Sequence, residues 1–201
     1  MVGSLTFEIK QFIEKNIKLI ENNDFDNFFY RAEGLFNINT IGILADVFKT
    51  IGCNPLEYMT FIPKGFFIIT DVDQLTVSHS IRRFGKRAFQ HCSLKELVVP
   101  SSVYTVNMYC FAGSDIETIH FEEGVVDIGE GCFLNCTSLK EVYLPSTIMR
   151  INESVFEGCS NLSTISYGGR KRDWVSLPGH QYITDGCDIK YIVCFDGLIE
   201  L

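Results

Sequence analysis

The sequence predicts an α+β fold in which a small N-terminal helical domain caps a β-solenoid of four to five coils. Two observations carry this prediction. Over residues 1–66 apolar residues recur every three or four positions, the period of amphipathic helices. From Leu75 onward the chain instead matches itself when it is shifted by 22 or 23 residues, which is typical of stacked coils. We therefore predict a helical domain over 1–66 and a repeat domain with a C-terminal capping segment over 67–201.

Three amphipathic helices are expected in the N-terminal domain. The first spans about 6–22, where the apolar residues form one stripe. Asp24 is placed to cap a second helix, and Thr40 is placed to cap a third that runs to about residue 51. Pro55 suits the first turn of a fourth, short helix before the repeats begin.

The repeats align as units that each carry a short strand, a turn and a second extended segment ending on a buried phenylalanine. The first strand column holds Leu75, Leu97, Ile119, Val142 and Ile165, and the closing column holds Phe89, Phe111, Phe133 and Phe156. A single coil cannot cover its own apolar face, so like residues of neighbouring coils are expected to stack in one continuous core. Cysteines occupy the same columns, so we interpret them as reduced core thiols rather than disulfides or metal ligands.

The outward side of the predicted strands is a candidate partner-binding face. Alternate residues of a strand point to opposite sides, so the residue between two buried positions faces outward. These residues form a row of Thr76, Val98, His120, Tyr143 and Ser166, and a second row, two positions earlier, includes Glu96 and Glu141. An apolar and aromatic strip flanked by carboxylates is typical of interface anchors, although such residues also simply suit a sheet surface.

Charge is distributed unevenly along the predicted stack. The first unit carries a basic patch of Arg82, Arg83, Lys86 and Arg87. The third unit carries an acidic patch of Glu117, Glu122, Glu123, Asp127 and Glu130. The basic patch suits a phosphate or an acidic protein surface, with a solvated turn face as the simpler interpretation.

Composition excludes several function classes. The net charge of -8 argues against direct binding to a nucleic-acid backbone, so a partner is expected to be basic or indifferent to charge. No apolar run is long enough for a membrane helix, and charged residues interrupt the first twenty positions. We therefore expect no membrane association, no secretion signal and a cytoplasmic location. No catalytic constellation or metal-ligand spacing occurs, so we expect no enzymatic activity, no cofactor and no metal.

The segments FGKRAFQHC, SLKELVVPSSVYTV and SLKEVYLPSTIMRI resemble the BspA-type leucine-rich repeats. This resemblance covers about 71–201, and the closing stretch from YGGRKRDW to DIKYIVCFDGLIEL is similar to the way many such proteins end. It implies a leucine-rich-repeat solenoid that binds another macromolecule without catalysis. Many proteins of this type are secreted surface adhesins, a role that requires a secretion signal.

The leading hypothesis is a non-enzymatic protein–protein interaction module that binds a macromolecular partner through the strand face. The alternative is a phage-encoded inhibitor of a bacterial defence system, anti-CRISPR-like in action, because the helical leader ending in NPLEYMTFIP is similar to leaders of small intracellular repeat proteins of phages and mobile elements. In that alternative the acidic third unit mimics a phosphate backbone against a basic host protein. Exposed strand edges and solenoid ends also leave self-association open.

Overall fold

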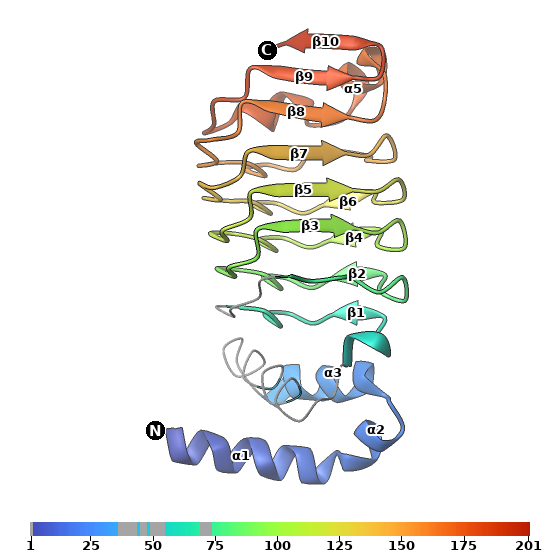
Figure 1. The fold of residues 1–201 in the computed structure, drawn as a ribbon, viewed down its shortest axis with the longest axis vertical. Helices are drawn as coiled ribbons and strands as arrows, with labels where there is room; N and C mark the ends of the chain where they lie inside the picture. Colours follow the sequence, from blue (N-terminus) through green and yellow to red (C-terminus); the bar gives the residue numbers. More distant parts are fainter. Residues whose placement is uncertain (1, 36–43, 45–47, 49–54, 69–73) are drawn as a thin grey trace.

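A computed structural model describes residues 2–35, 44, 48, 55–68 and 74–201. Helices lie at one end of a stack of strands, and the two chain termini lie at opposite ends of the molecule (Figure 1). The predicted α+β architecture, N-terminal helices followed by a β-solenoid, is confirmed. The helix predicted to follow Thr40 falls largely outside the described residues.

The first predicted helix is divided in two. α1 (Val2–Lys15) and α2 (Ile17–Glu21) are separated by Asn16, which is buried. Its side-chain amide donates to the carbonyl of Phe12 at 2.9 Å, and its side-chain oxygen accepts from Arg31 Nη1 at 2.9 Å. A side chain that bonds to the backbone in this way competes with regular helix continuation. The single helix predicted here is therefore wrong, because the apolar period runs on through the break.

α3 (Phe25–Leu35) joins the helices to the solenoid. It follows the predicted cap Asp24, and Phe25, Phe28 and Phe29 are fully buried. The Phe29 ring packs edge-on against Phe66 of the first coil, with the centroids 4.9 Å apart. The Asp26 carboxylate accepts the backbone N–H of Thr60 at 2.9 Å. Together with the 3₁₀ turn η1 (Pro55–Glu57), these contacts place the helical region over the end of the stack.

The coils build two sheets, a larger one in front and a smaller one behind it (Figure 1). The larger sheet contains β3 (Glu96–Val99), β5 (Thr118–Phe121), β7 (Glu141–Leu144), β8 (Thr164–Tyr167), β9 (Tyr191–Cys194) and β10 (Gly197–Glu200). The smaller contains β1 (Phe61–Ile62), β2 (Arg83–Phe84), β4 (Thr105–Val106) and β6 (Asp127–Ile128). In the larger sheet Ile119 pairs with Leu97 and with Val142, which confirms the predicted alignment of the repeats.

The core is a ladder of phenylalanines. Successive rings stack nearly parallel, with centroids 4.9 to 5.4 Å apart and planes inclined by 3 to 13°, in the order Phe67, Phe89, Phe111, Phe133 and Phe156. This spacing matches the separation of hydrogen-bonded strands, so each ring rests on the ring of the next coil. The predicted closing column of each unit is thus the centre of the molecule.

The two ends of the solenoid differ from the prediction in detail. β1 precedes the predicted start at residue 67 and pairs in parallel with β2, so the stack begins one coil earlier than the self-match indicates. At the other end β9 adds to β8, and β10 turns back antiparallel to β9. Trp174, on α5 (Lys171–Ser176), is fully buried with its ring 5.2 Å from that of Tyr167, and it covers the last coil as expected of a C-terminal cap.

The cysteine columns lie in the core as free thiols. Cys136 Sγ donates to the carbonyl of Phe111 at 3.0 Å, which ties one coil to the previous one. Burial raises the pKa of Cys92 to about 11, and it raises the pKa values of Cys110 and Cys132 as well. The reactive thiolate is therefore scarce at these positions at neutral pH.

We expect Cys110 and Cys132 to resist alkylation in the native protein. Both side chains are fully buried, and their raised pKa values leave them as thiols below pH 9. Iodoacetamide labelling at pH 8, followed by peptide mass spectrometry, should show modification at least about tenfold slower than in urea. Rapid labelling of either residue under native conditions would contradict the core position.

Candidate partner-binding face

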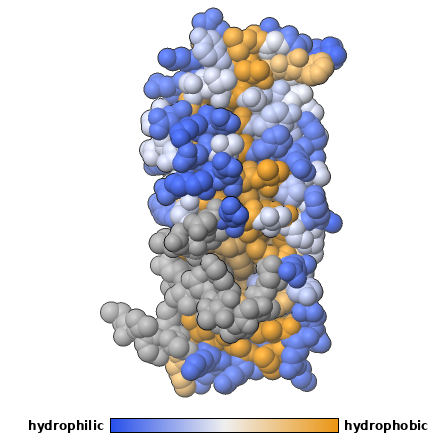
Figure 2. Space-filling view, in the orientation of Figure 1, coloured by the Kyte–Doolittle hydropathy of each residue, from blue (hydrophilic) through white to orange (hydrophobic). Residues whose placement is uncertain are grey.

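The predicted outward row exists as a continuous line along the larger sheet. Val98 pairs with His120, His120 with Tyr143, Tyr143 with Ser166, and Ser166 with Val193. Val98 is 55% exposed, so the row presents apolar surface to solvent. Figure 2 shows apolar side chains as an interrupted stripe along the stack between hydrophilic bands.

Thr76 departs from the predicted row. Residues 74–80 form no strand, so Thr76 is not paired with Val98 in the sheet. It is nevertheless exposed and lines the same hollow as Val98 and His120. The first coil therefore borders the face without extending its strand ladder.

The centre of the face is a stacked pair of rings. The rings of His120 and Tyr143 lie parallel, with centroids 4.4 Å apart and planes inclined by 2°. Gly168 leaves room for this arrangement, because a Cβ there would lie 2.8 Å from the Tyr143 hydroxyl. The backbones of the two residues are paired in neighbouring strands, so the rings form a flat aromatic platform on the sheet.

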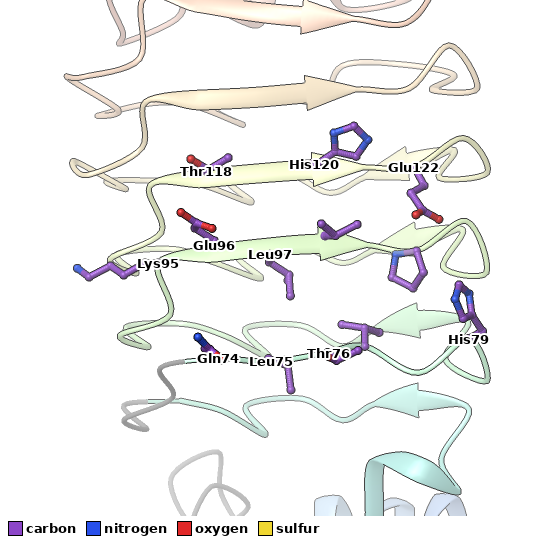
Figure 3. Close-up of a pocket in the computed structure, with 13 residues that line it drawn as sticks. Gln74, Leu75, Thr76, His79, Lys95, Glu96, Leu97, Thr118, His120 and Glu122 are labelled. Carbon is purple, nitrogen blue, oxygen red and sulfur yellow. The ribbon is translucent and has the colours of Figure 1, made fainter.

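Two hollows meet at this platform. One, of about 760 Å³, lies over the first coils, and the other, of about 340 Å³, lies over β5, β7 and β8. Both are lined by Thr118 and His120, so the two hollows adjoin across the strands, and we refer to them together as the groove. Figure 3 shows Glu96 and Thr118 toward one end of the strands, Glu122 and His79 toward the other, and His120 between them.

Carboxylates flank the groove as predicted. Glu96 and Glu141 lie on either side of Thr118 in the second row, and both are exposed. At the strand ends Lys140 Nζ lies 2.6 Å from Glu117, and this ammonium holds the pKa of the Glu117 carboxyl below its usual range. That ion pair is solvent-exposed and contributes little to stability. The carboxylates that line the groove without an ion pair to a described residue are Glu96, Glu122 and Glu141.

Comparison with known families decides what kind of repeat builds this face. The sequence profile described as "BspA type Leucine rich repeat region" matches residues 60–173 in six copies, which is more than half of the chain. The chain belongs to this family. BspA-type repeats generally serve as non-catalytic scaffolds for protein interaction, and the match begins at residue 60, in agreement with the early position of β1.

Two solved structures of leucine-rich-repeat proteins are similar to this BspA-type chain. One is a leucine-rich cell surface protein from Faecalibacterium prausnitzii A2-165, with 15% identity, a TM-score of 0.26 and coverage of 61% of each chain. The other is a leucine-rich repeat protein from Bacteroides ovatus ATCC 8483, with 16% identity, a TM-score of 0.28 and coverage of 56% of this chain and 48% of that one. The chain thus spans about half to three-fifths of these proteins. No curated protein sequence matches it.

The predicted acidic patch is distributed around a BspA-type coil rather than gathered on one side. Glu117 precedes β5, Glu122 and Glu123 follow it, and Asp127 lies in β6 with Glu130 just beyond. Each carboxylate bonds to a neighbouring coil. Glu117 pairs with Lys140, and Asp127 pairs with Arg150. Glu122 and Glu123 accept the backbone N–H groups of Ser101 and Ser146, and Glu130 accepts the Tyr109 hydroxyl. These residues therefore tie coils together, which a reading along the chain does not reveal.

The predicted basic patch lies at β2 and the turn after it, on the smaller sheet. The Arg83 guanidinium stacks on the Phe61 ring at 4.4 Å from its centroid. Lys86 and Arg87 approach the Tyr109 ring at 5.8 and 5.7 Å. The Arg82 guanidinium donates to the carbonyl of His79. Within the described residues, none of these four cations lies within ion-pair distance of a carboxylate.

The described part of the chain contains no candidate metal site and no candidate membrane span. Among those residues no three His, Cys, Asp or Glu side chains gather as metal ligands. None of the described helices has the length and apolarity needed to cross a bilayer.

Proposed function

We propose that this BspA-type repeat protein binds a protein partner through the groove of its larger sheet, with the His120–Tyr143 stack as the anchor. The stacked pair carries the proposal, because a rigid aromatic platform in a groove loses little conformational entropy on binding. No hydrogen bond joins either side chain to another described residue, so their polar edges are available to a partner. Val98 extends the apolar contact by one coil.

The charges around the platform indicate the chemistry of the partner. Glu96 and Glu141 are exposed carboxylates, and neither forms an ion pair with a described residue. A guanidinium or ammonium group that stacks on the aromatic face and pairs with one of these carboxylates would satisfy both features. We therefore propose a basic protein surface with an apolar side chain at its centre.

Substitution of the anchor tests this proposal. A protein captured on the intact chain should bind the His120→Ala/Tyr143→Ala variant at least about 30-fold more weakly, since truncated aromatic anchors cost on the order of 1–2 kcal/mol each. Isothermal titration calorimetry measures the affinity. The matched control is Tyr30→Ala/Val175→Ala, which removes exposed apolar side chains from helices outside the face.

Three outcomes are distinguishable. Weaker binding by the anchor variant alone supports the proposal. Equal binding by both variants places the interface elsewhere on the molecule and removes the proposal. A Glu96→Gln/Glu141→Gln variant tests the charge separately, and unchanged affinity and salt dependence would exclude a basic partner while leaving the aromatic anchor in place.

No specific observation favours the alternative of a phage-encoded inhibitor. Phosphate mimicry by the third coil requires a cluster of carboxylates on one surface, whereas these carboxylates lie at different points around the coil and bond to its neighbours. The general proposal of a protein partner does not depend on that alternative.

A further inference from the structure

One row of side chains on the far side of the molecule has a regular order of charge. It runs along the turns that follow the short strands and contains Lys64, Lys86, Met108, Glu130 and Glu153, one residue from each successive coil. Backbone hydrogen bonds fix the row. Each carbonyl of the row after the first accepts an N–H from the preceding coil, at 3.0 to 3.3 Å. The donor and acceptor pairs are Gly65 with Lys86, Arg87 with Met108, Tyr109 with Glu130, and Gly131 with Glu153.

The order along this row is two cations, one apolar residue and two anions. Reversal of the row converts every charge into its opposite and leaves Met108 in place. Two copies of the row laid side by side in opposite directions therefore set each lysine against a glutamate. A surface that complements itself after a half-turn is what a two-fold symmetric interface requires.

Exposed apolar side chains lie at the centre of the row. Tyr104, in the same coil as Met108, is 49% exposed, and Met108 itself is 38% exposed. Apolar side chains at the middle with charged residues at the periphery is the usual anatomy of a protein interface. Asp127 lies near this centre in the next coil, but its carboxylate is already paired with Arg150 at 3.2 Å. The charge complementarity between two copies therefore comes from the row that contains Lys86 and Glu130.

The charged side chains of Lys86, Glu130 and Glu153 are accessible to solvent. Lys86 approaches the Tyr109 ring at 5.8 Å from its centroid, and Glu130 accepts a hydrogen bond from the Tyr109 hydroxyl at 2.8 Å, so the two side chains lie beside the same ring on this face. No ion pair with a described residue involves Lys86, Glu130 or Glu153. This contrasts with the larger sheet, where Lys95 and Lys140 at the strand ends are paired with Glu117 of a neighbouring coil.

We infer that two copies of this chain associate through the short-strand face, the surface over β2, β4, β6 and the turns after them. The copies run antiparallel, with the two-fold axis through the coil of Met108 and Tyr104. Lys86 of each copy meets Glu130 of the other, and Lys64 meets Glu153 one coil further out. The larger sheet stays open on both copies, so the dimer is independent of the proposed partner groove.

Paired charge reversal tests the inference. One variant, Lys64→Glu/Lys86→Glu, makes the row acidic at both ends, and a second, Glu130→Lys/Glu153→Lys, makes it basic at both ends. The natural chain should dimerise with a dissociation constant on the order of 10–100 μM, as expected for a small interface. Each variant alone should be monomeric over that range, and an equimolar mixture should form a heterodimer.

Sedimentation velocity measures the masses, and native mass spectrometry distinguishes the heterodimer from either homodimer. The control is Lys18→Glu/Lys190→Glu, which changes the net charge as the first variant does but at exposed positions on α2 and before β9. The control should dimerise like the natural chain. A natural chain that stays monomeric, or variants whose mixture stays monomeric, would overturn the inference.

Substitution at the axis gives a second readout that does not depend on the lysines. Met108→Lys places like charges against each other in the dimer, and so does Met108→Glu, whereas a mixture of the two places opposite charges together. Circular dichroism verifies that each variant is folded, since Met108 is a surface residue. Dimers that persist in both single variants would show that the contact lies on another surface.

Discussion

Replacement of Phe111 by alanine is expected to lower the free energy of unfolding by about 3–5 kcal/mol. The ring is fully buried and stacks between Phe89 and Phe133, with centroid distances of 5.0 and 5.2 Å. Alanine removes both contacts and leaves a cavity that hydrogen-bonded coils on either side cannot close. Urea unfolding followed by far-UV circular dichroism measures the change.

The matched control for this prediction is Phe195→Ala. That ring is 78% exposed, so its removal should change the free energy of unfolding by less than about 0.5 kcal/mol. If Phe111→Ala and Phe195→Ala had similar small effects, the phenylalanine ladder would not be the main source of stability.

Removal of residues 1–57 is expected to convert the protein into aggregates. The helices cover Phe66, whose ring contacts Phe29, and Phe66 in turn packs against Phe67 at the head of the ladder. Without the helices, the apolar end of the first coil faces water next to β1, the edge strand of the smaller sheet, which favours association between copies. Size-exclusion chromatography with light scattering measures the particle mass.

A point variant separates the capping contact from the loss of chain length. Phe29→Asp keeps every residue but places a charge against Phe66, so it should lower the thermal midpoint and expose apolar surface to the dye ANS. A truncated protein that is monomeric and unfolds cooperatively would show that the solenoid needs no cap at this end.

The repeat columns could be predicted from the sequence because packing and hydrogen bonding both select for them. Leu97, Ile119 and Val142 share a column since each faces the core from a paired strand. The same alternation predicts which side chains face outward, and His120 and Tyr143 lie as expected. The binding role of the groove stays a prediction.

Features that depend on single polar contacts could not be predicted. The break at Asn16 follows from bonds to Phe12 and Arg31, whereas the apolar period that predicts a helix continues across it. The acidic residues of the third unit are close together along the chain, which predicts a contiguous cluster. In a solenoid, residues close in sequence spread around the coil, and residues 22 or 23 apart become neighbours, as Glu123 and Ser146 do.

The stacking of similar coils makes the length of the molecule adjustable in whole steps. Duplication of one coil would preserve the ladder of rings and lengthen the groove by about 4.8 Å, the separation of paired strands. Duplication of a coil would affect the row through Met108 differently. Its charges change sign on reversal only because Met108 stands at the centre of the row, with two lysines on one side and two glutamates on the other. An odd number of coils places a side chain on the two-fold axis, and an even number places a gap there. A relative that gained or lost a single repeat within this row would therefore keep the proposed partner groove and lose the proposed antiparallel pairing.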